Sequence, residues 1–465
     1  MSYLLAGTGR SDITPPPGTP QGGWGAQTHE RGLAADMPLY ATALVLSDSQ
    51  CQSAIVDFDC TGFSGSTWMD ETIRTVSCLT GIRTENIRLS YTHTHSGPNV
   101  YRLDVISQGQ DMVLKYLEEL PQRIAGAVWQ AQQDMRPVRF AAATGLCEMN
   151  VNRRAKLPDG RIVVGKNSSG HVDHTVRVVR FDDLNEDPVA TIVHYACHPT
   201  IMGWQTQYFT PDYPGVARQV VEREVGGRCL FLQGAAGNIG PVLGFTGDLK
   251  VYRRLGGWLG LEASKVALRI ETRPRRESLV GIQPSGAPIA LYRQEFEETD
   301  QHILRVCTRS IELPLKRFRP LADLEAELAD RLMARDRVRA EGKGEEEIRL
   351  ATALATQAED RVQDARIYEG KTYLTWPLQG IRIGPIALLS MPGEPFAELN
   401  HRILASSPFA HTLFSGYSNG GFGYLPPREA FAEGGFEVET SPFAPEAGDK
   451  LVDESIRVLT DLAAA

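Results

Sequence analysis

The sequence lacks the features of disulfide-rich, zinc-cluster and membrane-spanning proteins. Its seven cysteines form no Cys-x-x-Cys pair and are odd in number, which argues against a disulfide framework and a thiolate metal cluster. No apolar run approaches the length of a membrane span. Basic residues are dispersed and the net charge is -9, so we expect neither nucleic acid nor a membrane surface as a partner. Any metal should therefore be bound by histidine, carboxylate or phenolate groups.

The N-terminal residues MSYLLAGTGRSDITPPPG contain neither the basic stretch nor the long apolar stretch of a secretion signal, so we expect a cytoplasmic protein. The chain has 465 residues, of which 42% are hydrophobic and 23% charged, as in an ordinary globular protein with a substantial core. No linker, repeat or low-complexity tract marks a domain boundary. We therefore predict a single domain over residues 1–465.

Alternating segment types in the first half predict the fold class. YATALVLSD and SAIVDFD have strand character, STWMDETIRTVSCLTG has helical character, and NIRLSY is again a strand. Further apolar runs closed by polar or Gly-rich residues follow in ATIVHYACH and RCLFLQGAAG. The prediction is an α/β fold with a mixed β-sheet core flanked by helices.

One charged segment differs from this alternation. Leucines from Leu321 to Leu332 keep helical spacing, Gly342 and Gly344 interrupt the pattern, and it resumes up to Ala365. This predicts an antiparallel helical hairpin inserted at about residues 320–368. We interpret the hairpin as an insertion packed on the domain; a contact in a homo-oligomer is the alternative.

The first chemical signal is YTHTHSGPN, where His93 and His95 follow the predicted strand NIRLSY. The carboxyl ends of strands in α/β sheets are where sites collect. If the strand continued, both imidazoles would share a face and could bind one metal. Gly97 and Pro98 favour an early departure from strand geometry, which weakens that inference. Structural histidines in a loop remain an alternative.

A second signal is ATIVHYACHPT, in which His198 ends a strand while His194 lies inside it as an expected core residue. In the following FTPDYPG, Asp212 either orients a ligand histidine or forms a turn between prolines. His171 and His174 of HVDHTV are expected in a surface turn; the alternative places them at the site.

The C-terminal part offers oxygen donors. In SMPGEPFAEL, Glu394 lies between a strand and a helix, where a carboxylate serves either as a ligand or as a favourable helix-start charge. SGYSNGGFGYLPPREAFAEGGFEVE is rich in Gly and aromatics and predicts a loop that shapes a pocket. The candidate pocket residues of this loop are Tyr417, Tyr424 and Phe436, and ordinary packing is the alternative for each.

Taken together, these segments resemble the catalytic domain of the neutral/alkaline ceramidase family, particularly its short bacterial members. The motifs that carry the resemblance are SDITPP, ATALVLSD, THTHSGP, ACHPT, QGAAGNIGP, MPGEPF and GYLPPREAFAEGGFEV. They occur in order over nearly the whole chain. The resemblance identifies a family and does not establish the substrate.

The resemblance implies one catalytic Zn²⁺ with four protein ligands, namely His93, His198, Glu394 and Tyr424. It also implies that His95 handles a proton and that Arg153 of NVNRR contacts the substrate carbonyl or carboxylate. The implied reaction is hydrolysis of an amide by metal-activated water, with the metal and Arg153 stabilising the oxyanion.

The chain departs from the family pattern in three respects. In the segment that includes Asn238, Gly240 stands where the family has a serine. Phe436 stands where the family has a second tyrosine, and a phenyl ring donates no hydrogen bond. Losing one oxyanion donor can cost about 10²–10³ in rate. Finally, the C-terminal β-sandwich domain of ceramidases has no counterpart in this sequence.

These departures lead us to expect a zinc amidohydrolase acting on a small, soluble N-acyl or related amide. A zinc esterase or lactonase is the alternative enzyme, because esters are easier to cleave and need fewer oxyanion donors. A metal-containing binding protein without turnover is the alternative from another class. The simplest competing interpretation of all these candidate residues is a metal-free domain in which the histidines are structural.

Overall fold

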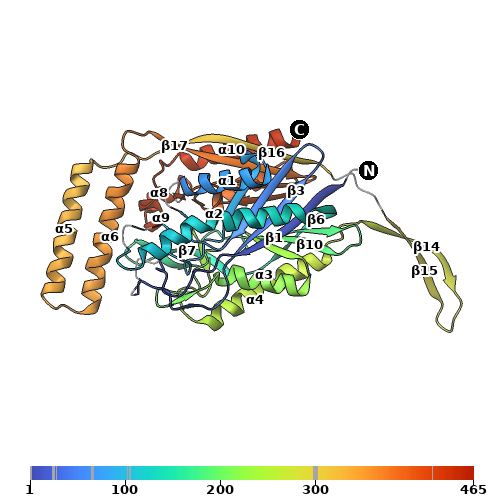
Figure 1. Ribbon diagram of the computed structural model, residues 1–465, viewed down its shortest axis with the longest axis horizontal. Coiled ribbons are helices and arrows are strands. Elements are labelled where there is room, and N and C mark those ends of the chain that lie inside the picture. Colours follow the sequence, from blue (N-terminus) through green and yellow to red (C-terminus); the bar gives the residue numbers. More distant parts are fainter. Residues whose placement is uncertain are drawn as a thin grey trace.

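Two β-sheets lie face to face in the computed structural model, and helices cover the outer face of each (Figure 1). The structure describes residues 3–22, 27, 29–63, 67–101, 103, 106–296, 302–421 and 423–464. Strands in the interior are buried on both faces, which is why they appear in the sequence as nearly continuous apolar runs.

The larger sheet has eight strands in the order β12-β10-β9-β6-β1-β3-β4-β5. Pairs β4/β5 and β10/β12 are parallel and the others are antiparallel, so the sheet is mixed, and the predicted fold class is confirmed. The strands are β1 (Leu4–Asp12), β3 (Tyr40–Ser47), β4 (Gln52–Phe58), β5 (Ile87–Tyr91), β6 (Arg136–Leu146), β9 (Thr175–Asp183), β10 (Pro188–Tyr195) and β12 (Arg228–Gln233).

The second sheet has the order β16-β17-β18-β20. Its strands are β16 (Leu304–Pro314), β17 (Tyr373–Ile383), β18 (Ile386–Ser390) and β20 (His411–Ser415), and α7 (Ala397–Ala405) and α10 (Ala447–Ala464) pack on its outer face. Successive side chains along each strand point to opposite faces of the sheet. In β18, Ile386 and Leu388 face the larger sheet, whereas Ala387 and Leu389 face the helices.

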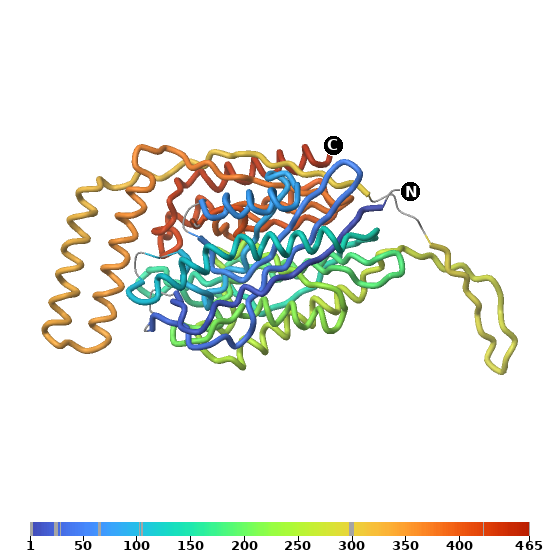
Figure 2. The backbone as a smooth tube through the Cα atoms, viewed as in Figure 1, coloured from blue at the N-terminus to red at the C-terminus, as the bar shows by residue number. Residues whose placement is uncertain are grey.

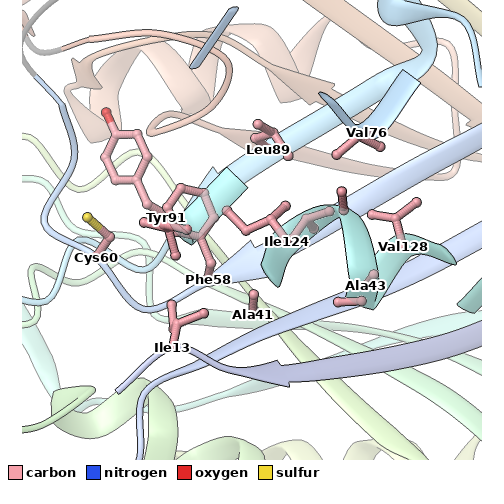
Figure 3. Packing of buried hydrophobic residues seen from close by; sticks show 14 of the residues in the cluster. Ile13, Ala41, Ala43, Phe58, Cys60, Val76, Leu89, Tyr91, Ile124 and Val128 are labelled. Atoms are coloured by element: carbon pink, nitrogen blue, oxygen red, sulfur yellow. The ribbon is translucent and has the colours of Figure 1, made fainter. Parts of the chain in front are cut away.

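Four helices cover the outer face of the larger sheet: α1 (Thr67–Thr80), α2 (Gln110–Gln133), α3 (Asp212–Glu224) and α4 (Leu249–Arg269). Figure 3 shows Ile124 and Val128 of α2 next to Ala41 and Ala43 of β3 in this core. Helix α2 approaches β1 closely because Gly9 has no side chain; a Cβ there would lie 2.1 Å from the Ala127 carbonyl oxygen.

Short elements at one end of the sheets position the site. They are the pair β2 (Ala34–Ala35) and β11 (Tyr208–Phe209), the sheet β13-β7-β8 with β7 (Asn150–Lys156), β8 (Ile162–Asn167) and β13 (Ile239–Pro241), the pair β19 (Glu394–Pro395) and β21 (Tyr424–Leu425), and helices α8 (Ala430–Glu433) and α9 (Phe436–Glu439). The short helix η1 (Thr84–Asn86) leads into the amino end of β5 instead.

Two hairpins project from the body in opposite directions (Figure 2). Helices α5 (Leu321–Ala340) and α6 (Glu345–Ile367) occupy the segment with helical leucine spacing and bury Leu324 against Val362 and Ala365. Strands β14 (Arg275–Gln283) and β15 (Ile289–Phe296) form the other hairpin. Among the described residues, no helix is both long and apolar enough to cross a membrane.

Candidate active site

Four segments that are far apart in the sequence meet at one end of the sheets. His93 lies two residues beyond β5 and His198 lies three residues beyond β10, both at carboxyl ends of strands. Glu394 and Tyr424 are directly paired residues of the two-stranded sheet β19/β21. The structure thus brings together all four residues that the family resemblance implies as zinc ligands.

The backbone turns sharply at His93, whose φ of 68° lies in the left-handed region. A non-glycine residue in that conformation costs of order 1–3 kcal/mol and persists only where its surroundings fix it. Strand β5 has already ended at Tyr91, as Gly97 and Pro98 suggested. The turn brings the imidazole of His93 between those of His95 and His198, whose rings each lie 4.8 Å away.

Imidazole nitrogens and one carboxylate oxygen converge on a single point. Nε2 of His93 is 3.2 Å from Nε2 of His198 and 3.3 Å from Nε2 of His95. Oε2 of Glu394 is 3.5 Å from Nε2 of His93 and 3.2 Å from Nε2 of His198. His93, His198 and Glu394 are buried, and His95 is partly buried.

Backbone carbonyls fix the tautomers of two of these histidines. Nδ1 of His93 lies 2.5 Å from the carbonyl oxygen of Thr61, and Nδ1 of His198 lies 2.8 Å from that of Ala236. A carbonyl oxygen only accepts, so each Nδ1 carries the proton and each Nε2 presents a lone pair. Burial also lowers the pKa of His198 to about 3, so its ring is neutral.

The converging atoms require a cation among them. Oε2 of Glu394 has no hydrogen-bond partner among the described residues, and the facing Nε2 atoms of His93 and His198 are lone pairs. A carboxylate oxygen that faces two nitrogen lone pairs is stabilised by a positive charge placed between them.

The spacing of these atoms fits a zinc ion. Zn–N and Zn–O bonds of about 2.0–2.1 Å at tetrahedral angles place ligand atoms about 3.3 Å apart. The separations among His93, His198 and Glu394 are 3.2, 3.2 and 3.5 Å. Nitrogen and carboxylate donors with fixed outer partners are typical of catalytic zinc.

Tyr424 and Arg153 form the neighbouring part of the site. The Arg153 guanidinium donates a hydrogen bond of 2.9 Å to the Tyr424 hydroxyl oxygen. Burial and the charge of Glu394 raise the pKa of Tyr424. Burial acts to lower the pKa of Arg153, but Tyr424 and Glu437 raise it overall, so the guanidinium keeps its charge.

Glu437 fixes the position of Arg153. Its Oε1 accepts from Nε of Arg153 at 2.9 Å, and its Oε2 lies 3.1 Å from the guanidinium of Arg154. Glu437 is only 1% exposed, so both ion pairs are shielded from water. Sequence reasoning missed this residue, and the only available signal was its place in the Gly-rich loop.

Two aromatic residues of that loop border the site. Tyr417 is fully buried, its ring lies 4.7 Å from that of His93, and its hydroxyl has no hydrogen-bond partner among the described residues. Phe436 is 43% exposed and packs edge-on against Tyr424, with ring centroids 5.8 Å apart. Phe436 thus lies at the rim of the site, where it donates nothing.

Asn238 and Gly240 belong to the segment behind Arg153. The Asn238 carbonyl accepts from the Arg153 amide at 2.8 Å, and its side chain bonds the start of α7 through Ala397 N and Glu398. Gly240 lies on β13 opposite β7, and a Cβ there would be 3.5 Å from the Arg153 Cβ, which is ordinary contact. A serine would fit at this position.

Of the two roles that the sequence left open for Asp212, the structure shows the turn. The Asp212 carboxylate accepts from the backbone N–H groups of Met202 and Tyr213, at 3.0 and 2.6 Å, at the start of α3. Its φ of 53° is one that Asp tolerates in turns. The carbonyls of Thr61 and Ala236 orient the histidines instead.

The remaining histidines lie apart from the converging atoms. His194 is a buried core residue whose Nε2 bonds the Phe414 carbonyl at 2.8 Å, and burial lowers its pKa to about 3. His174 bonds Asn150, and the exposed His171 lies beside His401 in the loop before β9.

A family model described as "Neutral/alkaline non-lysosomal ceramidase, N-terminal" matches residues 3–242. The chain is 26% identical over 397 residues to a neutral ceramidase of Pseudomonas aeruginosa, covering 77% of this chain and 57% of that protein. It is 31% identical over 148 residues to neutral ceramidase B of Dictyostelium discoideum, covering 30% of this chain and 20% of that protein. The matched part therefore spans less than two thirds of these relatives.

Solved structures show the same fold. The crystal structure of the Pseudomonas aeruginosa neutral ceramidase aligns with a TM-score of 0.69 at 20% identity, over 100% of this chain and 75% of that one. A structure described as ceramidase complexed with C2 aligns with a TM-score of 0.67 at 19% identity, over 100% of this chain and 76% of that one. At this level of identity the likeness establishes the fold alone.

Proposed function

Because the chain belongs to the neutral/alkaline non-lysosomal ceramidase family, we propose that it is a zinc-dependent hydrolase that cleaves the amide bond of a ceramide-type N-acyl lipid. The observation that carries the proposal is the convergence of His93 Nε2, His198 Nε2 and Glu394 Oε2 within 3.5 Å of one another. The zinc ligands we assign are His93, His198, Glu394 and Tyr424.

When bound at this point, zinc polarises a carbonyl group and lowers the pKa of a water molecule to about 7. His95 is the group placed to move the proton, because its Nε2 lies 3.3 Å from Nε2 of His93 at the edge of the ligand set. It accepts a proton from the attacking water and returns it to the leaving amine.

Arg153 binds the substrate carbonyl and stabilises the negative charge that develops on its oxygen. Its Nε is bonded to Glu437 and one terminal N–H to Tyr424, which fixes the plane of the guanidinium. A fixed, buried cation stabilises a developing oxyanion without reorganising during the reaction.

Tyr417 supplies the second oxyanion donor in place of the tyrosine that Phe436 replaces. Its hydroxyl is buried, and its pKa is raised well above the usual value by burial and by the charge of Glu394, so it keeps its proton. No described residue uses that proton in a hydrogen bond. The ring of Tyr417 lies 4.7 Å from that of His93, next to the converging ligands.

The substrate class we propose differs from the small, soluble amide expected from the sequence. The curated relatives that the chain matches are named neutral ceramidases, which favours a lipid amide. The exposed ring of Phe436 provides an apolar rim beside Tyr424, where an acyl chain can be buried. A soluble N-acyl substrate becomes the comparison compound of the test.

Hydrolysis of three matched compounds tests the proposal: a short-chain ceramide, its O-acyl ester counterpart and a soluble N-acyl amino acid. We expect zinc in the purified protein and fastest turnover of the ceramide. Ester turnover without amide cleavage would support an esterase, which the missing hydroxyl at Phe436 favours. Stoichiometric zinc without turnover of any of the three compounds would refute the proposed hydrolase activity.

A further inference from the structure

The β14–β15 hairpin, residues 275–296, stands away from the body and is called the arm below (Figures 1 and 2). Its two strands form a separate sheet, joined to no other strand in the part of the chain that the structure describes. Nearly all of its residues are exposed. An isolated two-stranded hairpin is marginally stable in water, so the arm needs a partner surface.

The two faces of the arm differ in polarity. Leu279 is opposite Tyr292 and Ile282 is opposite Ala290, so these residues share one face. That face carries four large apolar side chains with exposed fractions of 41–64%, namely Leu279, Ile282, Tyr292 and Phe296. Arg275, Glu277 and Gln294 share that face at the base of the arm. The other face carries Ser278, Arg293 and Gln283 together with Ile289 and Leu291, which are 56 and 44% exposed. Both faces therefore present uncovered apolar side chains, and the face with Leu279 and Tyr292, called the apolar face below, presents more of them.

A second uncovered apolar strip lies on α4. Trp258, Leu261 and Leu268 are 45, 57 and 60% exposed and are spaced three and seven residues apart, which places them on one side of the helix. Lys265 lies between them on the same side and pairs with Glu262. The helix ends at Arg269, shortly before β14 begins at Arg275. The strip and the arm therefore meet at one end of the molecule.

We propose that two copies of this chain form a two-fold symmetric dimer in which the arm of each copy lies along α4 of the other. A two-fold axis near the junction of α4 and β14 places each arm beside α4 of the other copy. Both uncovered apolar surfaces are then buried in one interface. The apolar face of the arm then covers Trp258, Leu261 and Leu268.

The dimensions of the two surfaces match. The eight residues of β15 extend about 27 Å at 3.3–3.4 Å per residue, and the 21 residues of α4 extend about 32 Å. A ribbon about 10 Å wide offers about 270 Å² per face, so two arms on two helices bury on the order of 1,100 Å². This approaches the lower limit for specific interfaces.

A lipid surface fits the arm less well than a second copy does. Residues 271–300 contain four arginines, no lysine and six acidic residues, so they do not attract anionic lipid. Figure 1 places the arm at the end of the molecule opposite α8 and α9, which flank the candidate site. An arm inserted in a bilayer would hold the site away from it.

Sedimentation velocity across the micromolar range tests the proposal on the full chain. Leu279→Glu with Tyr292→Glu charges the apolar face of the arm, and Leu261→Glu with Leu268→Glu charges the strip on α4. We expect a dimer for the native chain and monomers for both double variants, with unchanged thermal unfolding of the body. The matched control, Ser278→Glu with Gln283→Glu, adds two charges to the other face and should remain dimeric.

A monomeric native chain at every concentration overturns the proposal, as does a dimer that survives either double variant. Flotation with phosphatidylcholine vesicles distinguishes the lipid alternative. If the native chain is monomeric and binds vesicles, and the arm variant does not bind them, the arm is assigned to a membrane instead. The substituted residues lie outside the site, so hydrolysis by the monomeric variants checks that the fold is intact.

Discussion

The site has a nitrogen half and an oxygen half, and the two are held in different ways. In the nitrogen half, backbone carbonyls of Thr61 and Ala236 fix His93 and His198 just beyond the carboxyl ends of β5 and β10. In the oxygen half, a buried ion pair with Glu437 fixes Arg153, which in turn bonds Tyr424. Main-chain contacts hold one half and side-chain charges hold the other.

This difference separates two tasks. Main-chain carbonyl acceptors, here in the loops after β4 and β12, set the tautomer of a ligand histidine and cannot be removed by a single side-chain substitution, which suits metal binding. The side-chain network fixes the charge that meets the substrate, and each of its members can be changed alone. Substitutions of His93 or His198 should therefore affect metal content, and those of Arg153 or Glu437 should affect turnover with metal retained.

The largest effect is expected from His93→Ala or His198→Ala. Either change removes a nitrogen ligand, so zinc content should fall to background and amide hydrolysis by at least about 10³-fold. Elemental analysis and initial rates measure the two quantities. The exposed His171→Ala is the matched control and should retain both. Equal, negligible metal in the native chain and the variants would refute the metal site.

The next effect tests whether His95 belongs with the ligands. His95→Ala should keep most of the zinc and lose about 10²–10⁴ in kcat, because a proton-transfer group is missing while the ligand set is intact. The same two measurements apply. An empty site in this variant would instead make His93 and His95 a shared metal pair.

Arg153→Met should lower kcat/KM by about 10²–10³ with zinc retained, because the variant removes a buried cation beside the developing oxyanion. Arg153→Lys should recover only part of this loss, since an ammonium group cannot bond Glu437 and Tyr424 in one plane. Steady-state kinetics at saturating zinc gives both values. Loss of metal in Arg153→Met would show that the two halves are not separable.

Glu437→Gln should lower kcat/KM about tenfold through the position of Arg153, without changing zinc content. Adding this change to Arg153→Met should have little further effect on rate, which identifies a positioning role. Glu433→Gln is the matched control, because the exposed Glu433 also pairs with Arg154 at 3.2 Å. Additive effects of Glu437→Gln and Arg153→Met would contradict the assignment.

The smallest effect is expected from Phe436→Tyr. The new hydroxyl would extend from the ring that packs on Tyr424 and add one donor at the rim. We expect amide turnover to change by less than about threefold, because Tyr417 already supplies the second oxyanion donor. The ratio of amide to ester turnover is the measurement. A rise in that ratio of about tenfold or more would contradict the role of Tyr417.

The fold was predictable because its strands carry local signals. The runs at β3, β4, β10 and β12 are apolar and end in polar or Gly-rich residues, and the alternation with α1 and α2 favoured an α/β fold. The arm carried no comparable signal. Its alternation is the same for a strand buried on one face and for a strand in solvent, so exposure could not be inferred from the sequence.

The candidate site residues were predicted through the family resemblance together with their positions at strand ends. What the sequence could not supply were partners without a local pattern. Thr61 and Ala236 act through main-chain oxygens, which any residue type offers. Glu437 acts on a residue 284 positions away. For Asp212 the sequence left two roles open, because a carboxylate near a histidine in sequence can bond either the ring or the backbone; here it bonds the backbone.

The direct pairing of Glu394 with Tyr424 also determines when the site can exist during synthesis. A growing polypeptide folds from its N-terminus as it leaves the ribosome. The strands that carry His93 and His198 are made well before the partner residues at 394 and 424. A nascent chain therefore carries histidines without their carboxylate and phenol, and hydrolytic competence arises only once translation has passed Tyr424.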